Sequence, residues 1–171
     1  MQKISRYFIG LVIFPFMLMQ QSCGYKLSGA SIPAEMKTIS VQFFENNSTL
    51  VVPYLSQQFT EALKNRIRNQ SRLSITRSDA DANFEGRISD YSIRPVAIQG
   101  NERAGLNRLT ITVNVKYTNA LKPDQGFEQS FSRFKEFSIA GTSLQQQESR
   151  LITQINEELS EDIFNRAFAN W

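Results

Sequence analysis

Alternation of apolar and polar residues over positions 109–118 constrains the fold of this chain more than any other feature. The apolar members are Leu109, Ile111, Val113, Val115 and Tyr117, and polar or charged residues separate them. Successive side chains of a β-strand point to opposite faces of a sheet. The pattern therefore predicts a strand with one buried face and one wet face, as in an antiparallel sheet that is covered on one side only.

Two earlier segments also have the two-residue period of a strand. Residues 39–43 place Ile39, Val41 and Phe43 on one face. In the longer segment 82–98 the apolar residues change parity near Ser89–Asp90. A change of parity inside a long strand predicts a β-bulge.

A fourth strand is expected over 127–139, after a turn at 122–126. Its aromatic residues Phe131, Phe134 and Phe137 break simple alternation. Either this strand is bulged, or both of its faces are covered.

Two segments have helical periodicity. The first spans 51–70, with Pro53 in the first turn and the cations Lys64, Arg66 and Arg68 near the last turn, where they meet the negative end of the helix dipole. Its apolar face comprises Val52, Leu55, Phe59, Leu63 and Ile67. The second begins at a capping box formed by Ser143 and Gln146. Its apolar stripe comprises Ile152, Ile155, Leu159, Ile163, Phe164, Ala167 and Phe168.

The order β-α-β-β-β-α predicts an α+β fold. Two amphipathic helices can cover one face of a four-stranded, mostly antiparallel sheet, which gives a two-layer sandwich.

The N-terminus has the organisation of an export signal. Lys3 and Arg6 precede an apolar run at 7–19, which is shorter than the roughly 20 residues that span a bilayer. The run is followed by Ser22 and by Cys23, the only cysteine. We expect a lipoprotein signal peptide at 1–22 with acyl chains on Cys23, although Gln20 stands where such signals usually have Leu. The alternatives are an ordinary signal peptide with an unmodified cysteine and a core cysteine.

The domain boundaries follow from this interpretation. Residues 23–36 contain Gly, Ser and Pro and are expected to form a lipidated tether. Residues 37–171 are expected to form a single domain. Membrane attachment would then be through the N-terminal lipid, since several acyl chains together anchor a protein firmly.

Charge and composition exclude several functional classes. The formal net charge of +3 falls to +1 once Lys3 and Arg6 are removed with the signal, so a nucleic-acid partner is not expected. The chain has no histidine, and its single cysteine is expected to carry lipid. We therefore expect no enzyme activity, no metal site and no cofactor. Asp79 and Asp81 are interpreted as a solvated turn.

The acidic residues of the second helix are expected to form its solvated face. They are Glu157, Glu158, Glu161 and Asp162.

Basic residues gather around the connection between the second and third of the four expected strands, which contains Gly100 and Gly105. They are Arg94, Arg103 and Arg108, with Lys116, Arg133 and Lys135 on the neighbouring strands. Guanidinium groups bind phosphate bidentately, so this cluster favours an anionic ligand. The alternative is a charge-balanced surface in which Glu102 and Glu136 neutralise the cations.

Three features together resemble the LptE family of lipopolysaccharide-assembly lipoproteins, in its Bacteroidetes-type form. They are "CGYKLSG" at 23–29, "IPAEMKTISVQFFENNS" at 32–48, and the order of elements that follows. The resemblance covers essentially all of 23–171.

This resemblance implies a location, two partners and a ligand-binding region. LptE-like proteins are lipid-anchored in the outer membrane on its periplasmic side, plug the lumen of the β-barrel LptD and assist its assembly. They also bind lipopolysaccharide during its delivery to the outer leaflet. The implied lipopolysaccharide-binding residues of this chain are Arg94, Arg103, Arg108 and Lys135.

Two alternatives belong to other functional classes. The chain could be a free lipoprotein, facing the periplasm, that binds a small amphiphilic ligand. It could also be a scaffold for another envelope complex.

Overall fold

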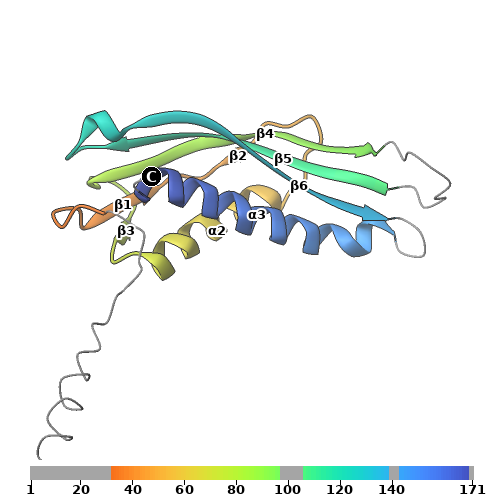
Figure 1. The fold of residues 1–171 in the computed structure, drawn as a ribbon, viewed down its shortest axis with the longest axis horizontal. Coiled ribbons are helices and arrows are strands. Elements are labelled where there is room, and N and C mark those ends of the chain that lie inside the picture. The colour runs from red at the N-terminus through yellow and green to blue at the C-terminus, as the bar shows by residue number, and fades with distance from the viewer. Residues whose placement is uncertain (1–31, 97–105, 139–142, 170–171) are drawn as a thin grey trace, which may run out of the picture.

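A computed structural model describes residues 32–96, 106–138 and 143–169. The architecture is α+β in two layers, as expected. One mixed sheet forms the first layer, and the two helices lie together on one of its faces, so that the other face is uncovered (Figure 1).

The elements follow in the order strand, strand, helix, four strands with a short 3-10 helix before the last of them, and helix. The strands are β1 (Thr38–Val41), β2 (Glu45–Asn46), β3 (Ser74–Thr76), β4 (Ala82–Pro95), β5 (Leu106–Asn119) and β6 (Phe127–Ser138). The helices are α2 (Leu55–Gln70), η2 (Pro123–Gln125) and α3 (Leu144–Phe168).

The sheet has six strands rather than the four expected. Its order is β3-β1-β4-β5-β6, and β2 pairs with β4 beyond the end of β1. The pairs among β4, β5 and β6 are antiparallel, whereas β1 runs parallel to β3 and β4, and β2 runs parallel to β4. Short strands such as β2 and β3 give too few residues for a periodic pattern, which is why the sequence did not predict them.

The expected strand over 39–43 is interrupted, and this corrects the position of one aromatic side chain. Phe43 was expected to point into the core, but it is 58% exposed, and Phe44 is fully buried instead. The reason is that β1 ends at Val41 and β2 begins at Glu45, so the two-residue period does not run through the segment between them.

The three long strands form the elongated part of the sheet. The predicted bulge in β4 is confirmed, because the register with β5 shifts between Ile88 and Asp90. The predicted burial of the alternating apolar residues of β5 is also confirmed.

β6 has neither of the two forms expected for it. Its register with β5 is unbroken from Phe127 to Ser138. Phe131 and Phe137 are buried on the helix-covered face, and Phe134 lies on the uncovered face with 48% of its surface exposed. The aromatics therefore divide between the two faces of a regular edge strand.

The helices complete the core. Leu55, Phe59, Leu63 and Ile67 of α2 and the predicted stripe of α3 are buried, apart from Ala167, which is partly buried. Pro53 lies just before α2 rather than in its first turn, and only Arg68 of the three predicted cations is in the last turn. The capping box of Ser143 and Gln146 is present at the start of α3.

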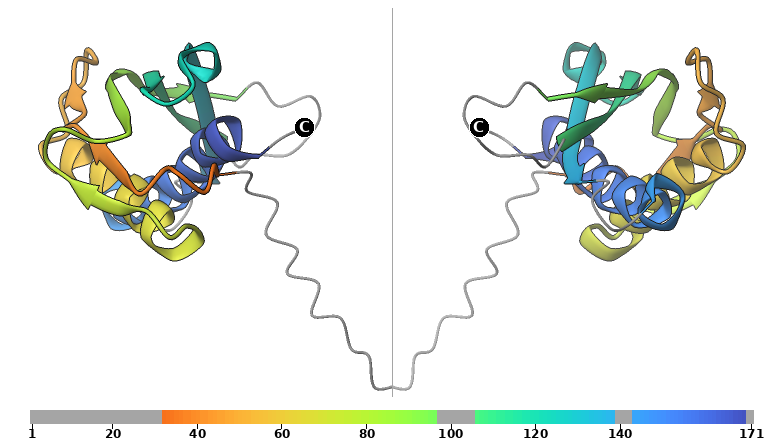
Figure 2. Two further views of the ribbon diagram at one scale, coloured as in Figure 1. Left: turned by 90° about the vertical axis from the view of Figure 1, so that its left-hand side faces the viewer. Right: turned by 90° about the vertical axis from the view of Figure 1, so that its right-hand side faces the viewer.

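The end-on views show the helix layer pressed against one side of the twisted sheet (Figure 2). Within the described ranges, neither helix is long and apolar enough to cross a membrane.

Candidate functional site

The structure brings two of the four predicted binding residues together. Arg94 is the last but one residue of β4, and it is the cross-strand partner of Arg108 on β5. Their neighbours Ile93 and Leu109 are partners on the helix-covered face, so both arginines belong to the uncovered face. They mark the end of the sheet at which β4 stops and β5 begins (Figure 1).

Arg108 is held by two contacts with β6. Its guanidinium stacks over the ring of Phe134, with Cζ 4.1 Å from the ring centroid. Its Nη2 and Nε atoms both donate to Oε1 of Glu136, at 2.5 and 3.2 Å. Both side chains are about two-fifths exposed, so solvent screens this ion pair. The guanidinium is therefore oriented by its partners but still accessible.

Lys135 does not join this pair of arginines. Its cross-strand partner is the buried Leu109, so Lys135 lies on the helix-covered face, where its ammonium contacts the carboxylate of Glu158 on α3. Arg103 lies outside the described residues, and so does Cys23.

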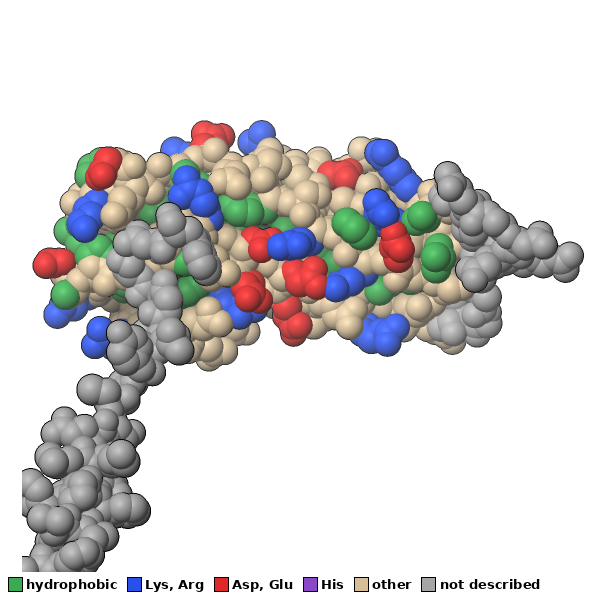
Figure 3. All heavy atoms as spheres, viewed as in Figure 1, with side chains coloured by type: hydrophobic (Ala, Val, Ile, Leu, Met, Phe, Trp, Pro, Cys, Tyr) green, Lys and Arg blue, Asp and Glu red, His purple; other side chains and the backbone are tan. Residues whose placement is uncertain are grey.

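The other cations named from the sequence also have acidic partners. Lys116 contacts Glu85 across β4 and β5 at 2.7 Å, and this hydrogen bond raises the pKa of the Lys116 ammonium. Arg133 binds Asp162 of α3, and this contact raises the pKa of its guanidinium. The space-filling view shows acidic and basic side chains interspersed over this part of the molecule (Figure 3).

The acidic residues of α3 do not only face solvent, because most of them also bind basic side chains. Three of the four make ion pairs: Glu158 with Lys135, Glu161 with Arg66, and Asp162 with Arg133.

The uncovered face of the sheet is rich in small hydroxyl and amide side chains. Between the Lys116 and Arg108 ends, β5 places Thr110, Thr112 and Asn114 on it. Thr112 is hydrogen-bonded to Ser132 of β6 across the pair, at 3.0 Å. Such a surface offers donors and acceptors to a partner without exposing a large apolar area.

A cluster of two tyrosines and a glutamate, near the end of the sheet that carries Arg94 and Arg108, could not be predicted from the sequence. The hydroxyls of Tyr91 and Tyr54 donate to the two carboxylate oxygens of Glu148, at 2.6 and 3.1 Å. Burial and this hydrogen bond raise the pKa of Tyr91. The cluster joins β4, the segment before α2 and the first turns of α3.

Asp81 has a structural role that the interpretation as a solvated turn missed. Its Oδ2 accepts hydrogen bonds from the backbone N–H groups of Lys37 and Thr38 and from the Thr38 hydroxyl, at 2.8 to 3.0 Å. In the part of the chain that the structure describes, no cluster of three or more His, Cys, Asp or Glu side chains could hold a metal ion.

Comparison with solved structures shows the same fold in several bacterial proteins. Lipoprotein B from Nitrosomonas europaea is 13% identical, with a TM-score of 0.50 over 78% of this chain and 82% of that chain. The hypothetical protein CT253 from Chlamydia trachomatis is 9% identical, with a TM-score of 0.51 over 79% of this chain and 99% of that chain. At these identities the similarity establishes the fold alone.

No curated protein sequence matches the chain. The sequence does match the family described as LptE, lipopolysaccharide-assembly, over residues 36–167. That range contains every helix and strand of the fold except the last residue of α3. The chain therefore belongs to the LptE family, whose role is lipopolysaccharide assembly.

Proposed function

We propose that this protein is an outer-membrane lipoprotein that plugs and assists assembly of an LptD-like β-barrel and binds lipopolysaccharide during its delivery to the outer leaflet. In this proposal residues 1–22 are a signal peptide that is removed, and Cys23 carries the lipid. Residues 23–36 form the tether, and 37–171 form the domain that enters the barrel from the periplasmic side.

The observation that carries the ligand-binding part of the proposal is the cross-strand pair of Arg94 and Arg108. Two guanidinium groups on one face, at the free end of a sheet, can bind the phosphate groups of lipid A bidentately. Arg103 follows in the connection between the same two strands and is the third member of the proposed set.

The arrangement of the fold is compatible with a membrane anchor at one end and a ligand-binding site at the other. The described chain begins beside β1 and β3 at one end of the long axis, and the arginine pair belongs to the other end (Figure 1). A protein anchored near one end can present the opposite end to a ligand that passes through its partner.

The contact between Arg108 and Glu136 sets a condition on binding. A phosphate that reaches this guanidinium has to compete with the carboxylate already there. Lys135 also remains in the proposed set. A ligand that reaches its ammonium has to displace the carboxylate of Glu158. Removal of the Glu136 charge should therefore strengthen binding.

Binding of fluorescent lipopolysaccharide to the purified full-length chain tests the ligand site. We expect the double variant Arg94→Glu, Arg108→Glu to bind at least about tenfold more weakly, since charge-assisted hydrogen bonds contribute about 1.5–3 kcal/mol each. Glu136→Gln should bind more tightly than the unchanged protein. The control is Lys116→Glu, which makes the same charge reversal elsewhere on the uncovered face.

The same variants separate ligand binding from barrel assembly. Recovery of a β-barrel partner with the tagged protein from detergent-solubilised outer membranes should be unchanged in the double arginine variant. If that variant binds lipopolysaccharide normally and loses the barrel, the arginine end contacts the barrel wall instead. If no barrel is recovered even with the unchanged protein, the two alternative envelope roles replace the plug.

The anchor has its own test. Metabolic labelling with an alkyne fatty acid should mark the unchanged protein and leave Cys23→Ala unmarked. Equal labelling of the two would contradict lipid attachment at Cys23.

A further inference from the structure

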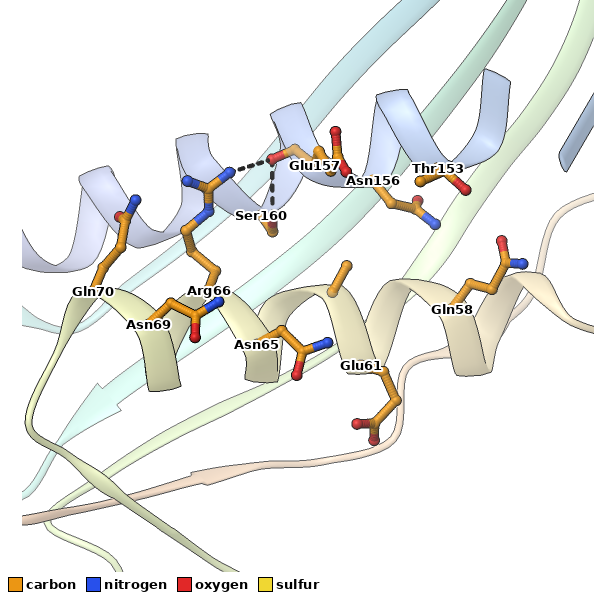
Figure 4. Close-up of a pocket in the computed structure, with 11 residues that line it drawn as sticks. Gln58, Glu61, Asn65, Arg66, Asn69, Gln70, Thr153, Asn156, Glu157 and Ser160 are labelled. Carbon is orange, nitrogen blue, oxygen red and sulfur yellow. Dashed lines mark hydrogen bonds between the residues drawn. The ribbon is translucent and has the colours of Figure 1, made fainter. Parts of the chain in front are cut away.

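The helix layer contains a polar groove that the proposed function does not use. It lies between α2 and α3 and has a volume of about 610 Å³ (Figure 4). Carboxamide and hydroxyl side chains supply most of its lining, among them Gln58, Asn65, Thr153, Asn156 and Ser160. Ala62 is the one apolar side chain among the described residues that line it.

Asn156 is the most unusual residue of this groove. It is only 2% exposed, yet neither its amide nitrogen nor its amide oxygen has a hydrogen-bond partner among the described residues. Buried polar atoms are nearly always paired, and an unpaired one costs about 1–3 kcal/mol. A residue that keeps both a donor and an acceptor unpaired at this depth indicates that something outside the described chain completes its hydrogen bonds.

A second unpaired atom belongs to another residue of the same lining. The side-chain oxygen of Gln58 is buried without a partner. In the close-up, Gln58 extends from α2 and Asn156 from α3 into the gap between the helices (Figure 4). Arg66, further along the groove, instead bridges the helices by donating to the backbone oxygen of Glu157 at 3.2 Å. The unpaired groups of the two helices therefore lie in the part of the groove away from Arg66.

The chemistry of these groups defines the ligand class. A hydroxyl is both a donor and an acceptor, so neighbouring hydroxyls of one ligand can satisfy the two amide atoms of Asn156 and the oxygen of Gln58 together. An extended peptide gains its specificity from pockets for alternate side chains, and Ala62 is the only apolar side chain that this lining offers for such a pocket. A polyhydroxylated ligand fits the groove better than a peptide does.

We propose that the α2–α3 groove binds a glycan segment, with Asn156 and Gln58 as its hydrogen-bonding residues. Its volume lies within the range of roughly 300–1,000 Å³ that is typical of ligand sites. In a protein of lipopolysaccharide assembly, the saccharide part of lipopolysaccharide is one available source, and the glycan strands of the cell wall are another. This site lies on the opposite side of the sheet from Arg94 and Arg108, so it is separate from the phosphate-binding end.

Isothermal titration of the purified full-length chain with three probes tests the proposal. The probes are the dephosphorylated, lipid-free oligosaccharide released from lipopolysaccharide by mild acid, a tetramer of N-acetylglucosamine, and a Gly-Ser octapeptide. We expect binding of at least one glycan, and the tighter of the two identifies the source. Because these probes lack phosphate, an absence of glycan binding would not contradict the proposed phosphate binding by Arg94 and Arg108. Equally, an absence of phosphate binding at the arginines would not contradict a glycan site in the groove.

Two variants locate the binding in the groove. Asn156→Leu removes both unpaired atoms at similar volume and should weaken glycan binding by about tenfold. It should not lower the melting temperature, because it replaces an unpaired buried amide with an apolar group. Ala62→Phe fills the groove from a partly exposed position and should also block binding. Asn165→Leu makes the same change on α3 away from the groove and should bind normally.

Three results would overturn the proposal. The first is the absence of binding by either glycan. The second is glycan binding that neither Asn156→Leu nor Ala62→Phe reduces. The third is binding of the peptide in preference to both glycans, which would make the groove a docking site for a protein segment.

Discussion

Arg133 of β6 and Asp162 of α3 form a bidentate ion pair, in which Nε and Nη2 each donate to one carboxylate oxygen at 2.6 Å. Lys135, two residues further along β6, makes a similar contact with Glu158. Both cations lie on the helix-covered face of an edge strand. Inward-pointing charges on an edge strand discourage another strand from pairing with it. The two pairs therefore fasten β6 to α3 and protect its free edge.

Loss of this protection should appear as self-association. We expect the double variant Arg133→Val, Lys135→Val to form larger species, because an apolar, β-branched edge strand is a template for strand pairing. Analytical ultracentrifugation in detergent measures the change against the unchanged protein. The matched control is Arg133→Gln, Lys135→Gln, which removes the charges without adding apolar surface. Equal sedimentation of the valine variant and the glutamine variant would contradict this role.

Gly86 is fixed by close packing against β5 and against Phe44, which lies between β1 and β2. A Cβ atom at this position would lie 2.0 Å from the backbone oxygen of Asn114 and 2.7 Å from the ring of Phe44. We expect Gly86→Ala to lower the free energy of unfolding by more than the ~1–3 kcal/mol typical of overpacking, because the nearer obstacle is backbone and cannot rotate away. Urea denaturation followed by circular dichroism measures the loss.

Gly126 provides the control for this prediction. A Cβ there would lie 3.1 Å from the oxygen of Pro123 and 3.2 Å from that of Tyr117, which small shifts relieve. Gly126→Ala should therefore cost about 1 kcal/mol or less. Similar losses for the two variants would show that the close approach at Gly86 is not the cause.

The elements that the sequence predicted well are those with many periods. Ten consecutive residues of β5, at 109–118, alternate without a break, and the apolar stripe of α3 continues from Ile152 to Phe168, so each pattern is unambiguous. The bulge in β4 was predictable because apolar residues on both sides of it fix the parity of each half. Phe43, in contrast, lies where β1 has ended and β2 has not begun, and no period extends across it.

The candidate sites show a different limit. The arginine pair could be predicted, because strands joined by one connection bring their ends together. The partners of Arg108 and Lys135 could not, because pairing with Glu136 or Glu158 depends on register and on the packing of α3. Asn156 carried one signal, a polar residue one position after Ile155 within the apolar stripe, but sequence alone does not distinguish a paired amide from an unpaired one.

The phase of α3 can be tested by two substitutions two positions apart. Leu159 is fully buried against the sheet, and Glu157 is exposed. We expect Leu159→Ala to lower the free energy of unfolding by about 2–5 kcal/mol, because it leaves a cavity in the core. Glu157→Ala should change it little. Glu158 is unsuitable as the control because it binds Lys135. Comparable melting temperatures for the two variants would contradict the observed helix phase.

Asp81 should make the stability of the fold depend on pH in the acid range. The backbone N–H of Lys37, the backbone N–H of Thr38 and the Thr38 hydroxyl donate to its carboxylate, and they lower the pKa of Asp81 below its usual 3.8. A carboxyl group whose pKa is lower in the folded state stabilises that state above pH 3.8 and loses this contribution as the pH falls through the folded pKa. The contribution is thus complete near neutral pH and absent in strong acid.

Asp81→Asn isolates this effect, because the amide keeps the shape of the side chain and cannot ionise. We expect the variant to be less stable than the unchanged protein at pH 7, and the difference to shrink as the pH falls below 3.8. Urea midpoints measured for both proteins between pH 7 and pH 2 follow the difference. Asp79→Asn is the control, because Asn tolerates the positive φ of 53° at that position. A difference that stays constant over the whole range would show that the charge of Asp81 does not stabilise the junction with β1.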